Sequence, residues 1–136
     1  MDVLTREERH RCMSAIRGQD TVPEIRLRKA LHALGYRYRL HVGSLPGKPD
    51  LVFPSRKKLI FVNGCFWHRH SCKSGRSVPS TRKSFWSAKL QNNAQRDRRN
   101  AKTLRKLGWG ILVVWECQLV PTGIRRVLNR VLAFLK

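Results

Sequence analysis

The chain has 136 residues, 41% of them hydrophobic, which suits one globular domain spanning residues 1–136 and excludes a disordered chain. Its 29 lysines and arginines outnumber its 8 aspartates and glutamates, so the net charge is +21. This charge predicts a polyanionic partner such as nucleic acid, and the sequence holds no apolar run of the roughly 20 residues that a membrane span needs.

A helix is expected to begin at Thr21, because Thr21 and Glu24 have the spacing of a capping box. Gly35 is a typical residue for ending such a helix. Between them, apolar residues recur at helical spacing on one face, at Leu27, Ala30, Leu31 and Leu34.

Three strands are expected after this helix. Residues 36–42 alternate between apolar and polar side chains, which is typical of a half-buried strand. The short apolar runs at 50–53 and 59–62 predict two buried strands, joined by a turn.

A long basic helix is expected from about Lys83 to Leu107, where Gly108 ends it. Residues 111–115 predict another buried strand, and an amphipathic helix follows from Thr122. The order helix, three strands, helix, strand, helix predicts an α/β fold with a mixed central sheet flanked by helices.

The few acids of this basic chain are candidates for chemistry. Asp50 begins the strand at 50–53, and it is either a turn residue or a carboxylate directed at the sheet edge. Asp97 lies on the inward stripe of the long helix, where it forms a structural ion pair or orients a histidine or a metal-bound water. For Glu24, a purely capping role is the simpler interpretation.

The stretch NGCFWHRHSC, residues 63–72, carries possible metal ligands at Cys65, His70 and Cys72. A structural zinc site has four ligands. Cys117 is the better remote candidate for the fourth, because neighbouring strands at 59–62 and 111–115 would bring it beside this loop. Cys12 is the weaker candidate, and free thiols are the alternative to a metal site.

The same stretch holds residues with no use for a metal. An unligated His68 titrates near neutral pH and suits general-base work. Phe66 and Trp67 form an aromatic pair that either stacks on bases and wedges between them or covers the metal site. Trp86, near the start of the long helix, is a third such aromatic or a core residue.

Several of these motifs resemble those of one family. The segments LPGKPDLVF, LIFVNGCFWHRHSC, QRDRR, LGW and VVWEC, in this order, are similar to those of the very-short-patch repair (Vsr) endonucleases. The resemblance runs from about Thr5 to Cys117. It implies a restriction-endonuclease-like core with a structural zinc site.

The resemblance also implies an activity and its partners. Such enzymes nick double-stranded DNA on the 5′ side of the thymine in a T:G mismatch left by deamination of 5-methylcytosine, and so initiate very short patch repair. They use magnesium and act alongside a cytosine-5 DNA methyltransferase. We therefore expect a monomeric protein in the bacterial cytoplasm, at the nucleoid, which agrees with the charged N-terminus and its lack of a signal-peptide core.

Roles for individual residues follow from the same resemblance. Asp50 and the carbonyl of Val62 would hold magnesium, with His68 as general base and Asp97 and Glu24 as supporting acids. The zinc ligands would be Cys65, His70, Cys72 and Cys117, and the DNA wedge would consist of Phe66, Trp67, Trp86 and Met13.

The chain departs from the family at Asn63, where some members have a histidine. An amide does not carry a proton at neutral pH as imidazole does. If the family's histidine assists catalysis, its contribution is reduced here or belongs to His68 alone. Two alternatives remain on the sequence: a restriction-like nuclease that cuts unmismatched sites, and a non-catalytic zinc-containing DNA-binding module.

Overall fold

The computed structural model describes residues 21–65, 68, 72 and 81–136. Within them the order is helix, three strands, helix, strand, helix, as the sequence predicted. The helices are α2 (Val22–Ala33), α4 (Lys83–Lys106) and α5 (Ile124–Leu135). The strands are β1 (Arg39–Leu40), β2 (Leu51–Phe53), β3 (Lys58–Asn63) and β4 (Gly110–Trp115). Short 3-10 helices, η1 (Pro54–Arg56) and η2 (Glu116–Gln118), follow β2 and β4.

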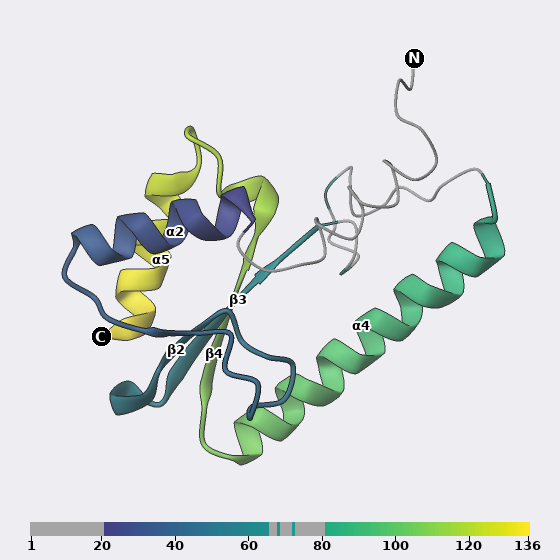
Figure 1. Cartoon of the computed structure of the whole chain (residues 1–136), viewed down its shortest axis with the longest axis horizontal. Coiled ribbons are helices and arrows are strands. Elements are labelled where there is room, and N and C mark those ends of the chain that lie inside the picture. The colour runs from purple at the N-terminus through teal and green to yellow at the C-terminus, as the bar shows by residue number, and fades with distance from the viewer. Residues whose placement is uncertain (1–20, 66–67, 69–71, 73–80) are drawn as a thin grey trace.

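The four strands form one mixed sheet in the order β1-β2-β3-β4 (Figure 1). β2 is antiparallel to both of its neighbours, whereas β3 and β4 are parallel from the pair Lys58–Gly110 to the pair Asn63–Trp115. Parallel neighbours require a crossover connection, and α4 lies within it. The carboxyl ends of β3 and β4 therefore meet at one edge of the sheet, and antiparallel β2 begins on the same side.

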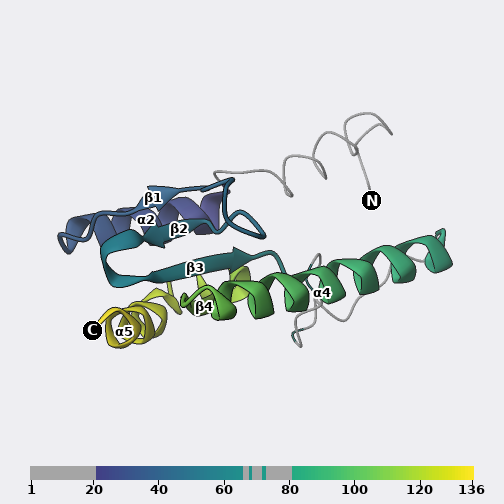
Figure 2. The ribbon, with the colours of Figure 1, turned by 90° about the horizontal axis from the view of Figure 1, so that it is seen from below.

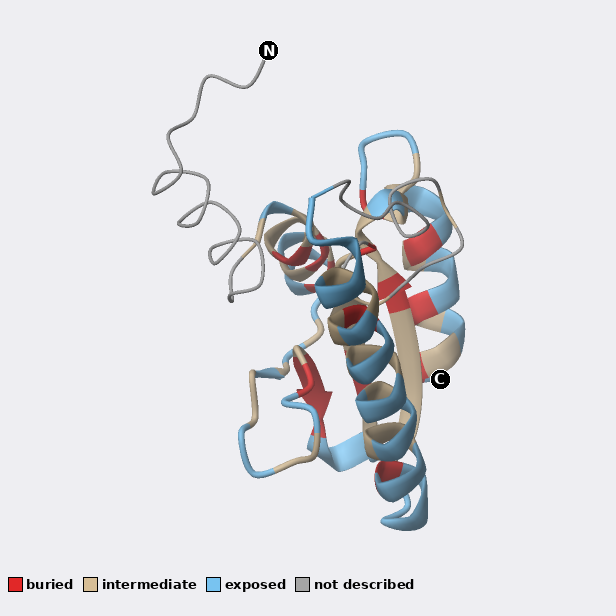
Figure 3. Ribbon diagram, turned by 90° about the vertical axis from the view of Figure 1, so that its right-hand side faces the viewer, coloured by how far each residue is buried: buried red, intermediate tan, exposed pale blue. Residues whose placement is uncertain are grey.

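Helices cover both faces of this sheet. Side chains that alternate along the strands divide between two clusters, because successive residues of a strand point to opposite faces. Ile60 and Val114 pack with the buried faces of α2 and α5, whereas Leu59 packs with Leu104 of α4. Figure 3 shows the buried positions on the strands and on the inward sides of the helices, while most of the surface of α4 is exposed.

The helix ends agree with the signals in the sequence. The Thr21 side chain accepts a hydrogen bond from the Glu24 backbone N–H and caps α2. Gly35 and Gly108 follow α2 and α4 with φ of 92° and 90°, a left-handed conformation that favours glycine. Leu34 was expected on the buried face, but it caps the end of α2 and is 53% exposed.

The strand expected at residues 36–42 is wrong in its length and its pattern. β1 has two residues, and both are exposed. Tyr38 packs against the α2 and α5 cluster, whereas Val42 packs against the cluster beside α4. The regular alternation fails at His41, which has a left-handed φ of 46°.

The N-terminal end of α4 extends beyond the end of the sheet, as Figure 2 shows. Among the residues described here, no helix combines the length and the apolar character that a bilayer crossing demands.

Candidate active site and cysteine cluster

A cleft of about 910 Å³ is bordered by the start of α2, by β3 and β4, and by α4. The structure thus brings together residues that lie far apart in the sequence. The lining includes these predicted site residues: Glu24, Asp50, Val62, Asn63, His68 and Asp97.

Asp50 is held at the start of β2 through its backbone and its side chain. Its N–H donates to the carbonyl of Ile60 at 3.1 Å, and its Oδ2 atom accepts from the Val62 N–H at 2.6 Å. The side chain is 15% exposed. Burial raises the pKa of Asp50 to about 7, although the hydrogen bond from Val62 opposes the rise. A carboxyl group with such a pKa in a cleft is typical of a functional site.

Glu24 lies close to Asp50 and is buried, with 4% of its surface exposed. Its Oε2 atom accepts a hydrogen bond from Arg28 Nη2 at 2.8 Å and lies 3.5 Å from His41 Nε2. A purely capping role for Glu24 is therefore wrong, because its carboxylate takes part in a buried polar cluster. One ligand atom each from Glu24, His41 and Asp50 lie within 4.8 Å of one another, close enough to share a metal ion.

His68 and Asp97 meet across the cleft. His68 Nδ1 contacts Asp97 Oδ2, so the acid on the inward stripe of α4 has a histidine as its partner. An ionised carboxylate only accepts hydrogen bonds, so this contact suits the tautomer of His68 that carries its proton on Nδ1. The His68 ring also packs edge-on against Trp115, with ring centroids 6.5 Å apart.

Asn63 is the last residue of β3, where it pairs with Trp115 of β4. It lines the cleft on the same side as His68.

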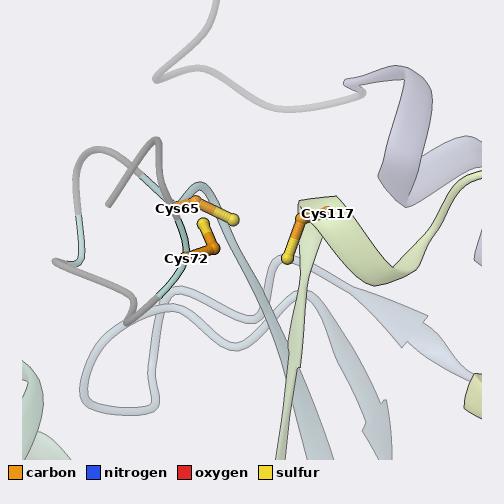
Figure 4. Close-up of side chains that lie close together, drawn as sticks. All are labelled: Cys65, Cys72 and Cys117. Carbon is orange, nitrogen blue, oxygen red and sulfur yellow. The ribbon is translucent and has the colours of Figure 1, made fainter. Parts of the chain in front are cut away.

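Three cysteines form a cluster just beyond the sheet (Figure 4). Cys65 follows β3 and Cys117 follows β4, so the parallel pairing of the strands brings the two thiols together, as the sequence predicted. With Cys72, their sulfur atoms lie within 4.8 Å of one another, and none of the three is in a disulfide bond. The Glu116 side chain accepts a hydrogen bond from the Cys65 N–H at 2.9 Å and ties the loop to η2.

The chemistry of this cluster fits a metal ion such as zinc. Ligands at about 2.3 Å in a tetrahedron place sulfur atoms roughly 3.8 Å apart, which agrees with the observed convergence. Burial raises the pKa of Cys65 to about 12 and also raises the pKa of Cys117. Metal coordination is a means of keeping such sulfurs ionised.

Some predicted residues do not contribute to this description. Cys12, Met13, Phe66, Trp67 and His70 lie outside the described residues. Trp86 is half-buried in the first turns of α4, with its ring edge-on to the exposed Phe85.

Two residues of this site were not predicted as members of it. His41 was assigned to the polar face of a strand, but it joins Glu24 and Asp50. Glu116 follows β4 directly and lines the cleft as well as contacting the cysteine loop. Glu116 is one of only 8 acids in the chain, and this rarity was a signal that could have found it.

Comparison with known proteins agrees with this geometry. The family described as DNA mismatch endonuclease Vsr matches residues 1–74. The type II nicking enzyme V.XorIIP of Xanthomonas oryzae pv. oryzae is 46% identical over 122 residues, which cover 90% of this chain and 89% of that protein. The type II nicking enzyme V.NmeAIP of Neisseria meningitidis serogroup A is 39% identical over 136 residues, with 99% and 96% covered.

The DNA mismatch endonuclease Vsr of Escherichia coli is 44% identical over 118 residues, which cover 87% of this chain and 75% of that protein. The matches span the cleft, the cysteine cluster and the sheet that carries them. The chain therefore belongs to the Vsr family of DNA mismatch endonucleases.

Proposed function

We propose that this endonuclease uses magnesium to nick DNA on the 5′ side of the thymine in a T:G mismatch, as the first step of very short patch repair. The observation that carries the proposal is the cleft in which a buried Asp50 and a His68–Asp97 pair lie together. The mismatches concerned are those that arise when 5-methylcytosine deaminates. The net charge of +21 suits a DNA substrate.

Asp50 and the backbone carbonyl of Val62 are the proposed magnesium ligands, with Glu24 beside them. Their oxygen atoms are the donors that a hard cation such as magnesium prefers. When bound, magnesium supplies positive charge against the phosphate and lowers the pKa of an attacking water. The Val62 N–H holds Oδ2 of Asp50 at 2.6 Å and so keeps the carboxylate in one orientation.

His68 is the proposed general base. Nε2 would accept the proton of the attacking water, while Asp97 holds the ring through Nδ1 and stabilises the imidazolium that forms. Asn63 cannot take this role, because its amide does not titrate, and it would contribute hydrogen bonds alone.

The cysteine cluster is proposed to bind a structural zinc ion, with His70 as the fourth ligand beside Cys65, Cys72 and Cys117. The ion would hold the loop that carries His68 at the end of β3. Within the same loop, Phe66 and Trp67 would enter the base stack beside the mismatch, together with Trp86 and Met13. A wobble pair is cheaper to open than a Watson–Crick pair, which would contribute to the choice of substrate.

The remaining proposals concern the context of the enzyme. The mixed sheet with helices on both faces supports a restriction-endonuclease-like core, formed by one domain of residues 1–136 that acts as a monomer. The relatives reported above are bacterial, which supports a site of action in the bacterial cytoplasm. Deaminated 5-methylcytosine as the lesion implies a functional link to a cytosine-5 DNA methyltransferase.

Nicking of three duplexes that differ only at one base pair tests the proposal. Three duplexes of one sequence, with T:G, T:A or C:G at the test position, are incubated with the enzyme with and without magnesium. We expect magnesium-dependent cleavage of the T:G duplex alone, in the thymine strand. Equal cleavage of all three duplexes would favour a restriction-like nuclease, and cleavage without any divalent ion would exclude the magnesium mechanism. A panel of T:G duplexes with varied flanks then defines the recognised sequence.

A further inference from the structure

We infer that His41 is a positioning residue of the metal site, which orients the carboxylate of Asp50 toward the ion. The inference rests on the proposed metal-binding role of Asp50. His41 is fixed beside β2, since its backbone N–H donates to the carbonyl of Asp50 at 3.3 Å. Its side chain is 12% exposed, so the ring has little freedom to turn away.

Arg28 contacts both the His41 ring and the Glu24 carboxylate. Nη2 of Arg28 lies 2.8 Å from His41 Nε2 and 2.8 Å from Glu24 Oε2. A guanidinium nitrogen can only donate, and Nη2 has two hydrogens, one for each of these partners. In this contact Nε2 of His41 takes the acceptor role, which suits the tautomer that carries its hydrogen on Nδ1.

The hydrogen on Nδ1 faces Asp50. Nδ1 lies 3.6 Å from Asp50 Oδ1, while the Val62 N–H holds the other carboxylate oxygen at 2.6 Å. Each oxygen of Asp50 thus has a donor group on its own side, and the two donors together define the plane of the carboxylate. The separation of 3.6 Å is just beyond hydrogen-bond distance, so a small rotation of either side chain would close the contact.

The same hydrogen argues against direct ligation by His41. Coordination of a metal by Nδ1 needs the lone pair that the hydrogen occupies in this tautomer. Moving the hydrogen to Nε2 would set it against the donor Nη2 of Arg28. A role through Asp50 is therefore the one that the geometry supports.

Two substitutions of His41 with side chains of equal length distinguish a positioning role of the ring from the effect of its size. His41→Gln keeps one donor and one acceptor, like a neutral imidazole, whereas His41→Met keeps the length with no N–H donor and only a weak acceptor. Both are unbranched residues in the same left-handed backbone position, so the backbone cost largely cancels between them. His32, which is exposed on α2, supplies the matched controls His32→Gln and His32→Met.

The experiment measures Mn²⁺ binding to the full-length, zinc-loaded protein without DNA, by titration followed with electron paramagnetic resonance. We expect His41→Met to bind Mn²⁺ about tenfold more weakly than His41→Gln, because His41→Met cannot form the hydrogen bond to the charged Asp50 that a small rotation would close. His41→Gln and both His32 variants should stay within about twofold of the unchanged protein. Equal binding by His41→Met and His41→Gln, with both variants folded in thermal melts, would overturn the inference.

Nitrogen coupling to the bound Mn²⁺ decides between positioning and ligation. Pulsed electron paramagnetic resonance should show no imidazole nitrogen coupling that is lost in His41→Gln. Such a coupling would make His41 a ligand and would overturn the positioning role. Asp50→Asn separates the two levels of the proposal: if it leaves Mn²⁺ binding unchanged, the metal-binding role of Asp50 in the proposed function fails. If Asp50→Asn abolishes binding and His41→Met does not weaken it, only the inference on His41 fails.

Discussion

His68 Nδ1 contacts Asp97 Oδ2, although 29 residues separate the two positions in the chain. Asp97 comes from the middle of α4, and His68 comes from the loop after β3. The contact therefore joins the helix that borders the cleft to the loop that holds the cysteine cluster. It engages Nδ1 of the imidazole and not Nε2.

Asp97→Asn is expected to slow nicking of a T:G duplex by at least about 100-fold, a typical contribution of a positioned general base. An amide oxygen is a weaker acceptor than a carboxylate, and an amide N–H in its place would favour the wrong tautomer of His68. Single-turnover kinetics at saturating DNA measure the effect on the chemical step.

The control for this prediction is the same change in a protein that already carries His68→Ala. Because the two side chains act as a unit, Asp97→Asn should then cost little further activity. If the losses of nicking rate from the two substitutions multiply in the double variant, Asp97 acts on catalysis by another route.

Asp50 gives the metal-free protein a stability that depends on pH. Burial raises the pKa of Asp50 to about 7, so the folded protein retains a proton that the unfolded chain has already released. The contribution of Asp50 to stability is fully present below about pH 4 and is lost as the pH rises through 7.

Asp50→Asn is therefore expected to raise the free energy of unfolding at pH 8 relative to the unchanged protein, by up to about 4 kcal/mol. The gain should be small at pH 4. Urea denaturation of magnesium-free protein measures both values, each against the unchanged protein at the same pH and the same zinc content. An equal effect of the substitution at the two pH values would contradict the raised pKa.

Metal binding at Asp50 should depend on pH for the same reason. Below pH 7 the ion must displace a proton from the carboxyl group, so the apparent affinity for Mg²⁺ or Mn²⁺ should rise with pH and level off above about 7. Calorimetric titrations between pH 5.5 and 8, in two buffers of different ionisation enthalpy, also count the released protons. An affinity that is flat over this range would argue against Asp50 as a ligand.

Cys117→Ser is expected to reduce the zinc content from about one ion per chain to a small fraction and to lower the melting temperature. Cys12→Ser, at the weaker candidate position, is the matched control and should retain the metal. Elemental analysis of both purified variants checks the prediction, and zinc retained in Cys117→Ser would remove Cys117 from the ligand set.

Arg96 lines the cleft on α4, whereas Arg125 is exposed on α5, which packs on the other face of the sheet. Arg96→Gln should weaken DNA binding and reduce the slope of log affinity against log salt by roughly 1. Arg125→Gln removes the same charge and should change the slope little. Fluorescence anisotropy at several salt concentrations compares the two, and equal slopes would mean that DNA binding does not depend on the cleft.

The sequence predicted the elements that have strong local signals. The runs at 59–62 and 111–115 became β3 and β4, and their pairing brought Cys117 to Cys65 as expected. The helical period placed Asp97 on the inward stripe of α4, where it meets His68. The prediction for Asp97 depended on the helical period alone. The prediction for Cys117 also depended on the assumption that the strands at 59–62 and 111–115 are neighbours.

The sequence did not predict the surroundings of His41 and Glu24. Strict alternation from Tyr36 to Val42 favoured a strand, and nothing in the pattern signalled the left-handed φ of 46° at His41. Glu24 occupies a capping position, which supplied a sufficient local explanation for an acid there. Its pairing with Arg28 has the i,i+4 spacing of a helix and could have been predicted from that spacing. The position of Glu24 beside His41 and Asp50 depends on tertiary packing that no window of the sequence contains.

The parallel pairing of β3 with β4 makes this site late to assemble during synthesis. On the ribosome, Asp50 and Cys65 emerge well before β4, and Cys117 follows Cys65 by more than fifty residues. Until β4 has joined the sheet, Glu116 cannot hold the Cys65 backbone and the third thiol of the cluster is missing. In an unfinished or prematurely released chain the structure that positions His68 is therefore incomplete, because it is finished only after most of the chain has been translated.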